Sequence, residues 1–243
     1  MRRSEVVTYG ARPEPTVFFE DDFISYSTSA TVDLATWFGT VGGTSDTITC
    51  IDSGTGGKLQ LLTGTVDNDE CSAQVNGESF KLAAGKRLKF QTLNLNANGN
   101  TLISQVGVFL GLSISSTTTM GADAIKIAGM TDFVGFLWDG TDLFAVAGKN
   151  ATATAWTAST SISKIDTGLA LVDATDIDLS FEYDGADTIR WYADGVLVAT
   201  LTDAGTKTLI PDDEDLTPTI GAISLTGAAQ TVTLDYISVE MDR

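Results

Sequence analysis

The acid–base chemistry open to this sequence depends on its carboxylates and lysines, because its 243 residues include no histidine. The serine–histidine and cysteine–histidine nucleophile pairs, and the histidine ligands of metal sites, are therefore absent. The closest approach to a set of paired carboxylates is Asp176, Asp178 and Glu182, whose alternation places all three side chains on one face of a strand.

Retaining hydrolysis of a glycosidic bond needs two carboxyl groups about 5 Å apart. The run from Asp176 to Glu182 matches this need poorly, because no aromatic residue that could stack on a sugar shares its polar face. A strand with one solvent-exposed face explains the same alternation. We therefore expect no catalytic residues and predict that the protein is not an enzyme.

Two other runs of acidic residues, 67–70 and 212–215, are dense in the oxygen atoms that calcium prefers. Neither has the EF-hand loop pattern with its closing glutamate. Solvated acidic loops explain both runs, so the sequence requires no metal.

Aromatic rings are the usual platforms for sugars, and the chain has four tryptophans. Trp138 and Trp191 lie in expected strands at positions that face the core, which predicts packing roles. Trp37 is expected to close one end of the fold. Trp156 lies in a segment rich in threonine and alanine, so we expect it to be exposed and to be the contact for any glycan.

The formal charge of −18, from 32 acidic and 14 basic residues, excludes nucleic acid as a partner, because the surface repels phosphate. No apolar run is long enough to cross a membrane, and Met1–Arg3 precede polar residues rather than the apolar stretch of a secretory signal. Cys50 and Cys71 could form one bridge, but two separate buried thiols are the favoured interpretation.

Short segments of alternating apolar and polar residues, separated by turn residues, indicate an antiparallel β-sandwich. The clearest lie at 176–202, where Asp184-Gly185 and Asp194-Gly195 predict the two turns of a three-stranded meander. In 87–95 the apolar residues change face, which predicts a β-bulge near Thr92. Further strands are expected at 17–23, 47–51, 58–62, 71–75, 105–112, 134–138, 143–147, 219–225 and 231–241, with one helical turn at 33–37.

The first 16 residues have a different character, because Pro13 and Pro15 favour extended backbone. We predict an extended N-terminal arm at 1–16 and one sandwich domain at 17–243. Val6, Val7 and Tyr9 are the apolar residues of this arm that could dock on a partner. A disordered terminus explains the same residues equally well.

The segment LSFEYDGADTIRWYADGVLVATL (179–201) resembles the central hairpins of concanavalin A-like jelly rolls, the fold of legume lectins, laminin-G-like modules and laminarinase-type glucanases. The runs FFEDDF (18–23) and VTLDYISVE (232–240) resemble the first and last strands of that fold, which pair side by side. The resemblance implies an all-β antiparallel sandwich that requires no cofactor. It also implies a Ca²⁺ site near the paired end strands, with Glu20, Asp22 and Asp235 as ligands.

The glucanases of this group carry a Glu-x-Asp-x-x-Glu pattern on one strand. Here aspartate replaces the first glutamate of that pattern, at Asp176, and the spacing to Glu182 differs. This departure puts glucanase activity in doubt, and a glucanase-like hydrolase is accordingly only the third hypothesis.

Domains of this kind that follow a short arm are similar to accessory structural proteins of tailed bacteriophages. The leading hypothesis is therefore a virion structural protein, made in the host cytoplasm, that decorates or cements the capsid surface. It would bind the major capsid protein or other virion proteins as a homo-oligomer or in many copies. The alternative is a carbohydrate-binding module or tail-fibre domain that recognises host glycans. The sequence leaves open the oligomeric state and the choice between capsid and tail.

Overall fold

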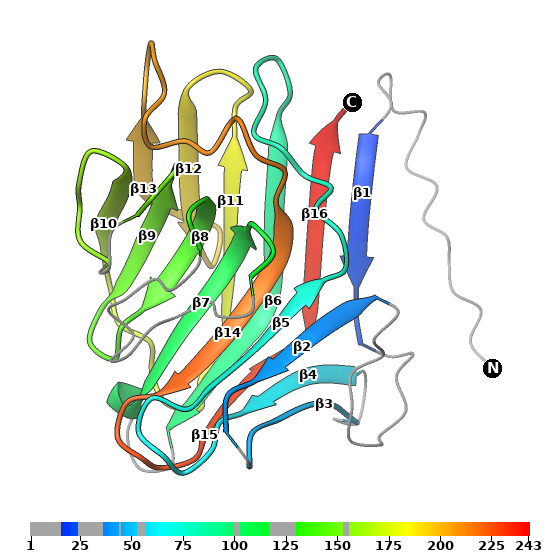
Figure 1. Cartoon of the computed structure of the whole chain (residues 1–243), viewed down its shortest axis with the longest axis vertical. Helices are drawn as coiled ribbons and strands as arrows, with labels where there is room; N and C mark the ends of the chain where they lie inside the picture. The colour runs from blue at the N-terminus through cyan, green and yellow to red at the C-terminus, as the bar shows by residue number, and fades with distance from the viewer. Residues whose placement is uncertain are drawn as a thin grey trace, which may run out of the picture.

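Two antiparallel β-sheets, stacked face to face, make up the fold (Figure 1). The computed structural model describes residues 16–23, 36–43, 45–52, 57–99, 103–116, 130–152 and 156–243. Among these residues the one helical element is a short 3₁₀ turn, η1 (Ile103–Gln105). No helix in this part of the chain is long and apolar enough to span a membrane. The predicted all-β sandwich is therefore confirmed.

The larger sheet, called sheet A here, has nine strands. In spatial order they are β13 (Val196–Thr202), β12 (Thr188–Ala193), β11 (Ile177–Tyr183), β6 (Leu88–Gly99), β15 (Gln230–Leu234), β4 (Gly57–Leu62) and β3 (Thr47–Asp52), with β16 (Tyr236–Asp242) beside β6 and β1 (Thr16–Asp21) beside β16. The long strand β6 thus pairs first with β16 and then with β15 along the same edge.

The smaller sheet, sheet B, has seven strands. In spatial order they are β10 (Ile162–Leu169), β9 (Leu143–Gly148), β8 (Phe133–Trp138), β7 (Val106–Ser113), β14 (Thr217–Ser224), β5 (Glu70–Val75) and β2 (Trp37–Val41). Every residue of β7, β8 and β14 is buried, so both faces of the middle of this sheet are covered.

The core lies between the sheets and is rich in aromatic side chains. Phe90 and Phe181 face each other across β6 and β11, with stacked rings whose centroids are 4.9 Å apart. Trp191 of sheet A donates a hydrogen bond from Nε1 to the carbonyl of Gly135 in sheet B, at 2.9 Å. Trp138 and Trp191 are both buried, which confirms their predicted packing roles.

Local patterns predicted several elements correctly. The meander is present as β11, β12 and β13, and Gly185 and Gly195 have the positive φ that its turns require. The bulge in β6 occurs directly after Thr92, because Leu179 pairs with Thr92 while Ile177 pairs with Leu95. Strands β1 and β16 lie side by side, as expected for the first and last strands.

Other expectations need correction. Trp37 begins β2, where a helical turn was predicted at 33–37, although 33–35 lie outside the described residues. The last strand divides at Asp235 into β15 and β16, which pair with different partners. Strands β2 and β10 were not predicted. The arm residues Val6, Val7 and Tyr9 lie outside the described residues.

Candidate functional site

The outer face of sheet B is covered by side chains of the same chain. Phe109, Phe133 and Leu137 project outward from β7 and β8 and pack with Trp156 and Met130, all of them at most 1% exposed. A polar row continues this face, in which Gln74 Nε2 donates to Ser113 Oγ, Thr219 Oγ1 and the Ile114 carbonyl at 2.9–3.1 Å. This face therefore offers little open surface to a ligand.

Trp156 corrects one expectation directly. Its side chain is 1% exposed, with its ring centroid 4.8 Å from that of Phe133 and 5.8 Å from that of Phe109. The ring cannot stack on a sugar in this position. The prediction that Trp156 is exposed, made from its segment of threonine and alanine, is therefore wrong. Composition does not reveal that the outer face of sheet B carries large apolar side chains against which Trp156 packs.

The outer face of sheet A, by contrast, is polar and carries a groove. The groove crosses the ends of β6, β11, β12 and β16, and its lining holds three basic and four acidic side chains. These are Arg87, Lys89, Arg190, Glu182, Asp184, Glu240 and Asp242. In a chain with a net charge of −18, this gathering of cations makes the groove locally close to neutral.

The strand register of sheet A explains how these side chains meet. Glu182 of β11 pairs with Arg190 of β12 on one side and with Lys89 of β6 on the other, and Lys89 pairs in turn with Glu240 of β16. Acidic and basic residues thus alternate across four neighbouring strands. Lys89 Nζ lies 3.6 Å from a Glu182 carboxylate oxygen, and both side chains are about half exposed.

Arg190 and Tyr192 stand out in this face by their side chains. Both project outward from β12 and are half-buried, and neither side chain makes a hydrogen bond or ion pair with another described residue. Arg190 does act on Asp184 through space: burial raises the pKa of Asp184, but three backbone hydrogen bonds and the charge of Arg190 outweigh it and lower that pKa. Tyr192 is paired with Ser180 on β11 and with Leu197 on β13, and Leu197 is 51% exposed.

Arg190, Tyr192 and Leu197 together suit a polar ligand that carries many hydroxyl groups. A guanidinium presents its N–H groups in a flat fork that suits a pair of oxygen atoms. The ring of Tyr192 and the side chain of Leu197 supply apolar area next to that fork. Ser180 and Gln91 continue the same row with neutral hydrogen-bonding groups.

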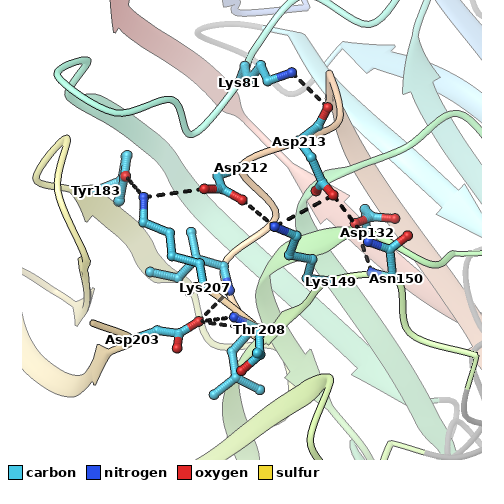
Figure 2. A network of polar contacts seen from close by, with 12 residues as sticks. Lys81, Asp132, Lys149, Asn150, Tyr183, Asp203, Lys207, Thr208, Asp212 and Asp213 are labelled. Carbon is cyan, nitrogen blue, oxygen red and sulfur yellow. Dashed lines mark hydrogen bonds and ion pairs between the residues drawn. The ribbon is translucent and has the colours of Figure 1, made fainter. Parts of the chain in front are cut away.

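A polar network next to the groove fixes the loop between β13 and β14 (Figure 2). Lys149 Nζ donates to Asp212 Oδ1 at 2.5 Å, and Lys207 Nζ lies 3.6 Å from the other oxygen of that carboxylate. Lys207 also donates to the hydroxyl of Tyr183 at 2.6 Å, and Asp203 accepts three backbone N–H groups of the loop. All of these groups are satisfied by one another, so we interpret the network as structural.

Of the three carboxylates considered for catalysis from the sequence, Glu182 lines the groove, whereas Asp176 and Asp178 lie outside it. Asp176 and Asp178 accept hydrogen bonds from the Asn96 side chain and the Asn94 backbone, at 2.7 and 2.9 Å. Asp178 and Glu182 are four residues apart on one strand, which separates their backbones by about 13 Å. That distance is too long for the roughly 5 Å of a retaining glycosidase pair.

The proposed calcium ligands do not gather. Glu20 accepts a hydrogen bond from the Tyr236 hydroxyl, and Asp235 accepts one from the Asn94 side chain. Asp22 is exposed just after β1. No group of three carboxylate, histidine or cysteine side chains placed to hold a metal occurs in the described residues, these three included.

The two cysteines are separate and buried, as the sequence favoured. Burial, followed by the charge of Asp21, raises the pKa of Cys50 to about 12. Burial likewise raises the pKa of Cys71 well above its ordinary value, with further contributions from Asp46 and Glu70.

Comparison with known proteins identifies the fold. No protein-family model and no curated protein sequence matches the chain. An endo-1,3-β-glucanase from Streptomyces sioyaensis is similar in structure, with a TM-score of 0.61 and 15% identity over 96% of this chain and 99% of that one. A family 16 endo-glucanase from Bacteroides ovatus gives 0.61 and 11%, over 91% and 99%. Peanut lectin gives 0.57 and 10%, over 93% and 97%.

These likenesses correct two expectations. The prediction that the protein is not an enzyme is wrong as stated, because the similar structures include endo-glucanases as well as lectins, so the fold leaves catalysis unresolved. The predicted role in a bacteriophage virion gains no support, since the similar structures named here are glucanases and a lectin. What the comparisons show is that the chain has the concanavalin A-like jelly-roll fold shared by lectins and family 16 glucanases.

Proposed function

We propose that the protein is a carbohydrate-binding domain whose ligand lies on the outer face of sheet A, over Arg190 and Tyr192. The observation that carries the proposal is Arg190, a half-buried residue whose side chain lines this groove without an ion pair or hydrogen bond among the described residues. Desolvating such a group without a partner is unfavourable, so a ligand with suitable oxygen atoms would gain from filling its donors.

The geometry favours a sugar over a simple anion. Glu182 and Asp184 lie beside Arg190 in the groove and would repel a phosphate or carboxylate ligand. The hydroxyl groups of a neutral sugar can instead donate to these carboxylates and accept from Arg190. The fold agrees with this chemistry, since the similar structures include a lectin and two glucanases.

Glycan-array screening followed by calorimetric titration tests the proposal. The wild-type protein should bind at least one neutral glycan, and Tyr192→Ala and Arg190→Gln should each weaken that binding about tenfold or more. Tyr236→Ala is the matched control, because Tyr236 lies on the same sheet but on β16, on the other side of β6 from β12, and pairs with Leu93. A silent array, or full affinity in both the Arg190 and the Tyr192 variant, would reject the assignment.

A second candidate, glycoside hydrolysis, rests on the spacing of Glu182 and Glu240. Both point into the groove, from strands on either side of β6. Two strand spacings separate their backbones by about 9.5 Å. This is close to the wider separation of inverting glycosidases, roughly 6.5–9.5 Å. Release of reducing sugar from β-glucans that is lost in both Glu182→Gln and Glu240→Gln would establish hydrolysis, and unchanged release in either variant would exclude this pair.

A further inference from the structure

Away from the groove, two connections on the β3–β4 side of the sandwich bring oxygen atoms together. Ser45 and Asp46 precede β3, and Asp69 precedes β5. A Cβ atom built on Gly64 would lie 2.1 Å from Asp69 Oδ2, 2.6 Å from Asp46 Oδ1 and 3.0 Å from Ser45 Oγ. Two carboxylates and a hydroxyl, from connections that are distant in sequence, therefore converge beside the backbone of Gly64.

Two glycines keep the space around these carboxylates open. A Cβ on Gly43 would lie 2.6 Å from Asp69 Oδ2, and a Cβ on Gly64 would lie even closer to the same atom. Neither glycine has a positive φ, so conformational freedom does not explain either residue. A Cβ at either position would collide with the Asp69 carboxylate in its present conformation, so the two glycines allow this carboxylate to lie where it does.

Asp46 is the strongest sign that the cluster holds a ligand. The residue is 7% exposed, and its Oδ2 accepts a hydrogen bond from the Gly43 backbone at 2.6 Å. Its Oδ1, which lies near Gly64 together with the Asp69 carboxylate and Ser45 Oγ, is buried and has no hydrogen-bond partner among the described residues. A buried carboxylate oxygen without a partner is unfavourable, more so with a second carboxylate beside it.

No basic side chain of the described residues offsets this charge. Neither Asp46 nor Asp69 forms an ion pair with a lysine or arginine in this part of the chain. The pKa of Cys71 in the core is raised mainly by burial, and the negative charge of Asp46 raises it further. The space beside Gly64 is therefore flanked by two carboxylates that no described lysine or arginine pairs with.

We propose that Asp46, Asp69 and Ser45 bind one calcium ion, which ties the β2–β3 connection to the β4–β5 connection. Calcium takes hard oxygen ligands in irregular arrangements, and it accepts carboxylates, hydroxyls, backbone carbonyls and water together. Since only two carboxylates are present, carbonyl groups and water would complete the ligand set. The site differs from the one predicted at Glu20, Asp22 and Asp235, and it does not depend on carbohydrate binding.

Calorimetric titration of chelator-treated protein with CaCl₂, together with thermal unfolding in EDTA or in excess CaCl₂, tests the proposal. We expect one ion per chain and a higher Tm in calcium. MgCl₂ should raise the Tm less, because magnesium demands a more regular octahedron. Asp46→Asn and Asp69→Asn should each lose the binding heat and the calcium-dependent rise in Tm.

Asp67→Asn is the matched control, because it removes one charge from the same connection, while Asp67 is exposed and outside the cluster. It should keep both the binding heat and the rise in Tm. Wild-type protein without binding heat at millimolar calcium would overturn the proposal, as would full binding by Asp46→Asn. If calcium has no effect and Asp46→Asn raises the Tm at neutral pH, the two carboxylates only repel each other, and the proposal fails.

Discussion

Lys149 Nζ donates a hydrogen bond to Asp212 Oδ1 at 2.5 Å, and this contact joins the end of β9 in sheet B to the loop that leaves β13 of sheet A (Figure 2). Lys207, on the same loop, approaches the second oxygen of Asp212. Both lysine side chains are less than a fifth exposed. A partly buried ion pair at such a junction should therefore influence global stability more than an ion pair on the surface.

We predict that Lys149→Met lowers the free energy of unfolding at neutral pH by about 1–3 kcal/mol, because it leaves the Asp212 carboxylate partly buried with one partner fewer. Urea-induced unfolding measures this loss. Lys89→Met is the control, since Lys89 pairs with Glu182 where both side chains are about half exposed. Its effect should stay below about 1 kcal/mol. Equal losses in the two variants would contradict a special role for the Lys149 contact.

The same ion pair predicts a pH dependence. Burial raises the pKa of Asp212, but the hydrogen bond and charge of Lys149 and the charge of Lys207 outweigh it, so the pKa falls below 3.8. A depressed folded-state pKa gives stability that is present above pH 3.8 and is lost as the pH falls through the folded-state value. The stability difference between wild type and Lys149→Met should therefore shrink under acid. A difference that is constant from neutral pH down to about pH 2 would argue against the pair.

At alkaline pH, Lys149 predicts a loss of stability as the pH rises, instead of as it falls. Burial lowers the pKa of Lys149, but its contacts with Asp212 and Asp213 outweigh burial and raise the pKa above 10.5. The resulting stability is complete below pH 10.5 and is lost as the pH rises through the folded-state value. Wild type should therefore approach Lys149→Met in stability again in strong alkali, as followed by circular dichroism.

Arg190→Lys should not restore the glycan binding that Arg190→Gln removes. Lysine keeps the positive charge but replaces the flat fork of donors with a single ammonium group. If the contact is bidentate, affinity should remain about tenfold below wild type, and calorimetry against the glycan found in the array measures this. Full recovery with lysine would mean that charge alone matters, as expected for an anionic ligand.

How far the sequence predicts this molecule depends on the range of each signal. The Asp-Gly turns of the meander and the change of face after Phe90 are local, so the strands of β11–β13 and the bulge in β6 were predictable. Arg190 carried no such signal, because its place in a groove depends on β6 and β16, which are distant in sequence. Trp156 was misjudged for the same reason, since its cover of Phe109 and Phe133 is a long-range contact.

The proposed calcium site at Asp46, Asp69 and Ser45 could be predicted from the sequence only in part. The run 67–70 was recognised as rich in oxygen, but its partner Asp46 lies in a connection with no acidic run of its own. Only the antiparallel pairing of β3 with β4 and of β2 with β5 brings the two connections together. Glycines at 43 and 64 look like ordinary turn residues in sequence, and their role in making room for Asp69 appears only in three dimensions.

The buried cysteines should be inert in the folded protein. The pKa of Cys50 is raised to about 12 and that of Cys71 is raised by burial, so both remain thiols near neutral pH, whereas the thiolate is the reactive form. Ellman's reagent should label neither thiol in native buffer within the time that labels both in denaturant. Rapid labelling of native protein would show that one of these sites opens readily.

Trp156 and Trp191, two of the four buried tryptophans, should respond differently to loss of the indole N–H. Trp191 donates from Nε1 to the Gly135 carbonyl across the core, whereas the Nε1 of Trp156 is buried and has no hydrogen-bond partner within the part of the chain that the structure describes. Trp191→Phe should therefore destabilise the protein by about 1 kcal/mol more than Trp156→Phe, since only the former loses a buried hydrogen bond. Urea-induced unfolding of both variants compares them, and the reverse order would contradict the contact between the sheets.

Gly135 on β8 lies opposite Gly111 on β7, where the two backbones leave no room for a side chain. A Cβ added there would lie 2.3 Å from the Leu110 carbonyl oxygen and 2.8 Å from the Gly111 Cα, both of which are backbone atoms that cannot rotate away. Gly135→Ala must therefore push the two strands apart and disturb the Trp191 hydrogen bond, which should cost at least about 1–3 kcal/mol. Gly195→Ala is the matched control, because its Cβ meets nothing within 4 Å and the change adds only the strain of a positive φ, about 1 kcal/mol. Urea-induced unfolding should rank Gly135→Ala as the less stable of the two, and the opposite order would show that sheet B is looser at β7 and β8 than this packing implies.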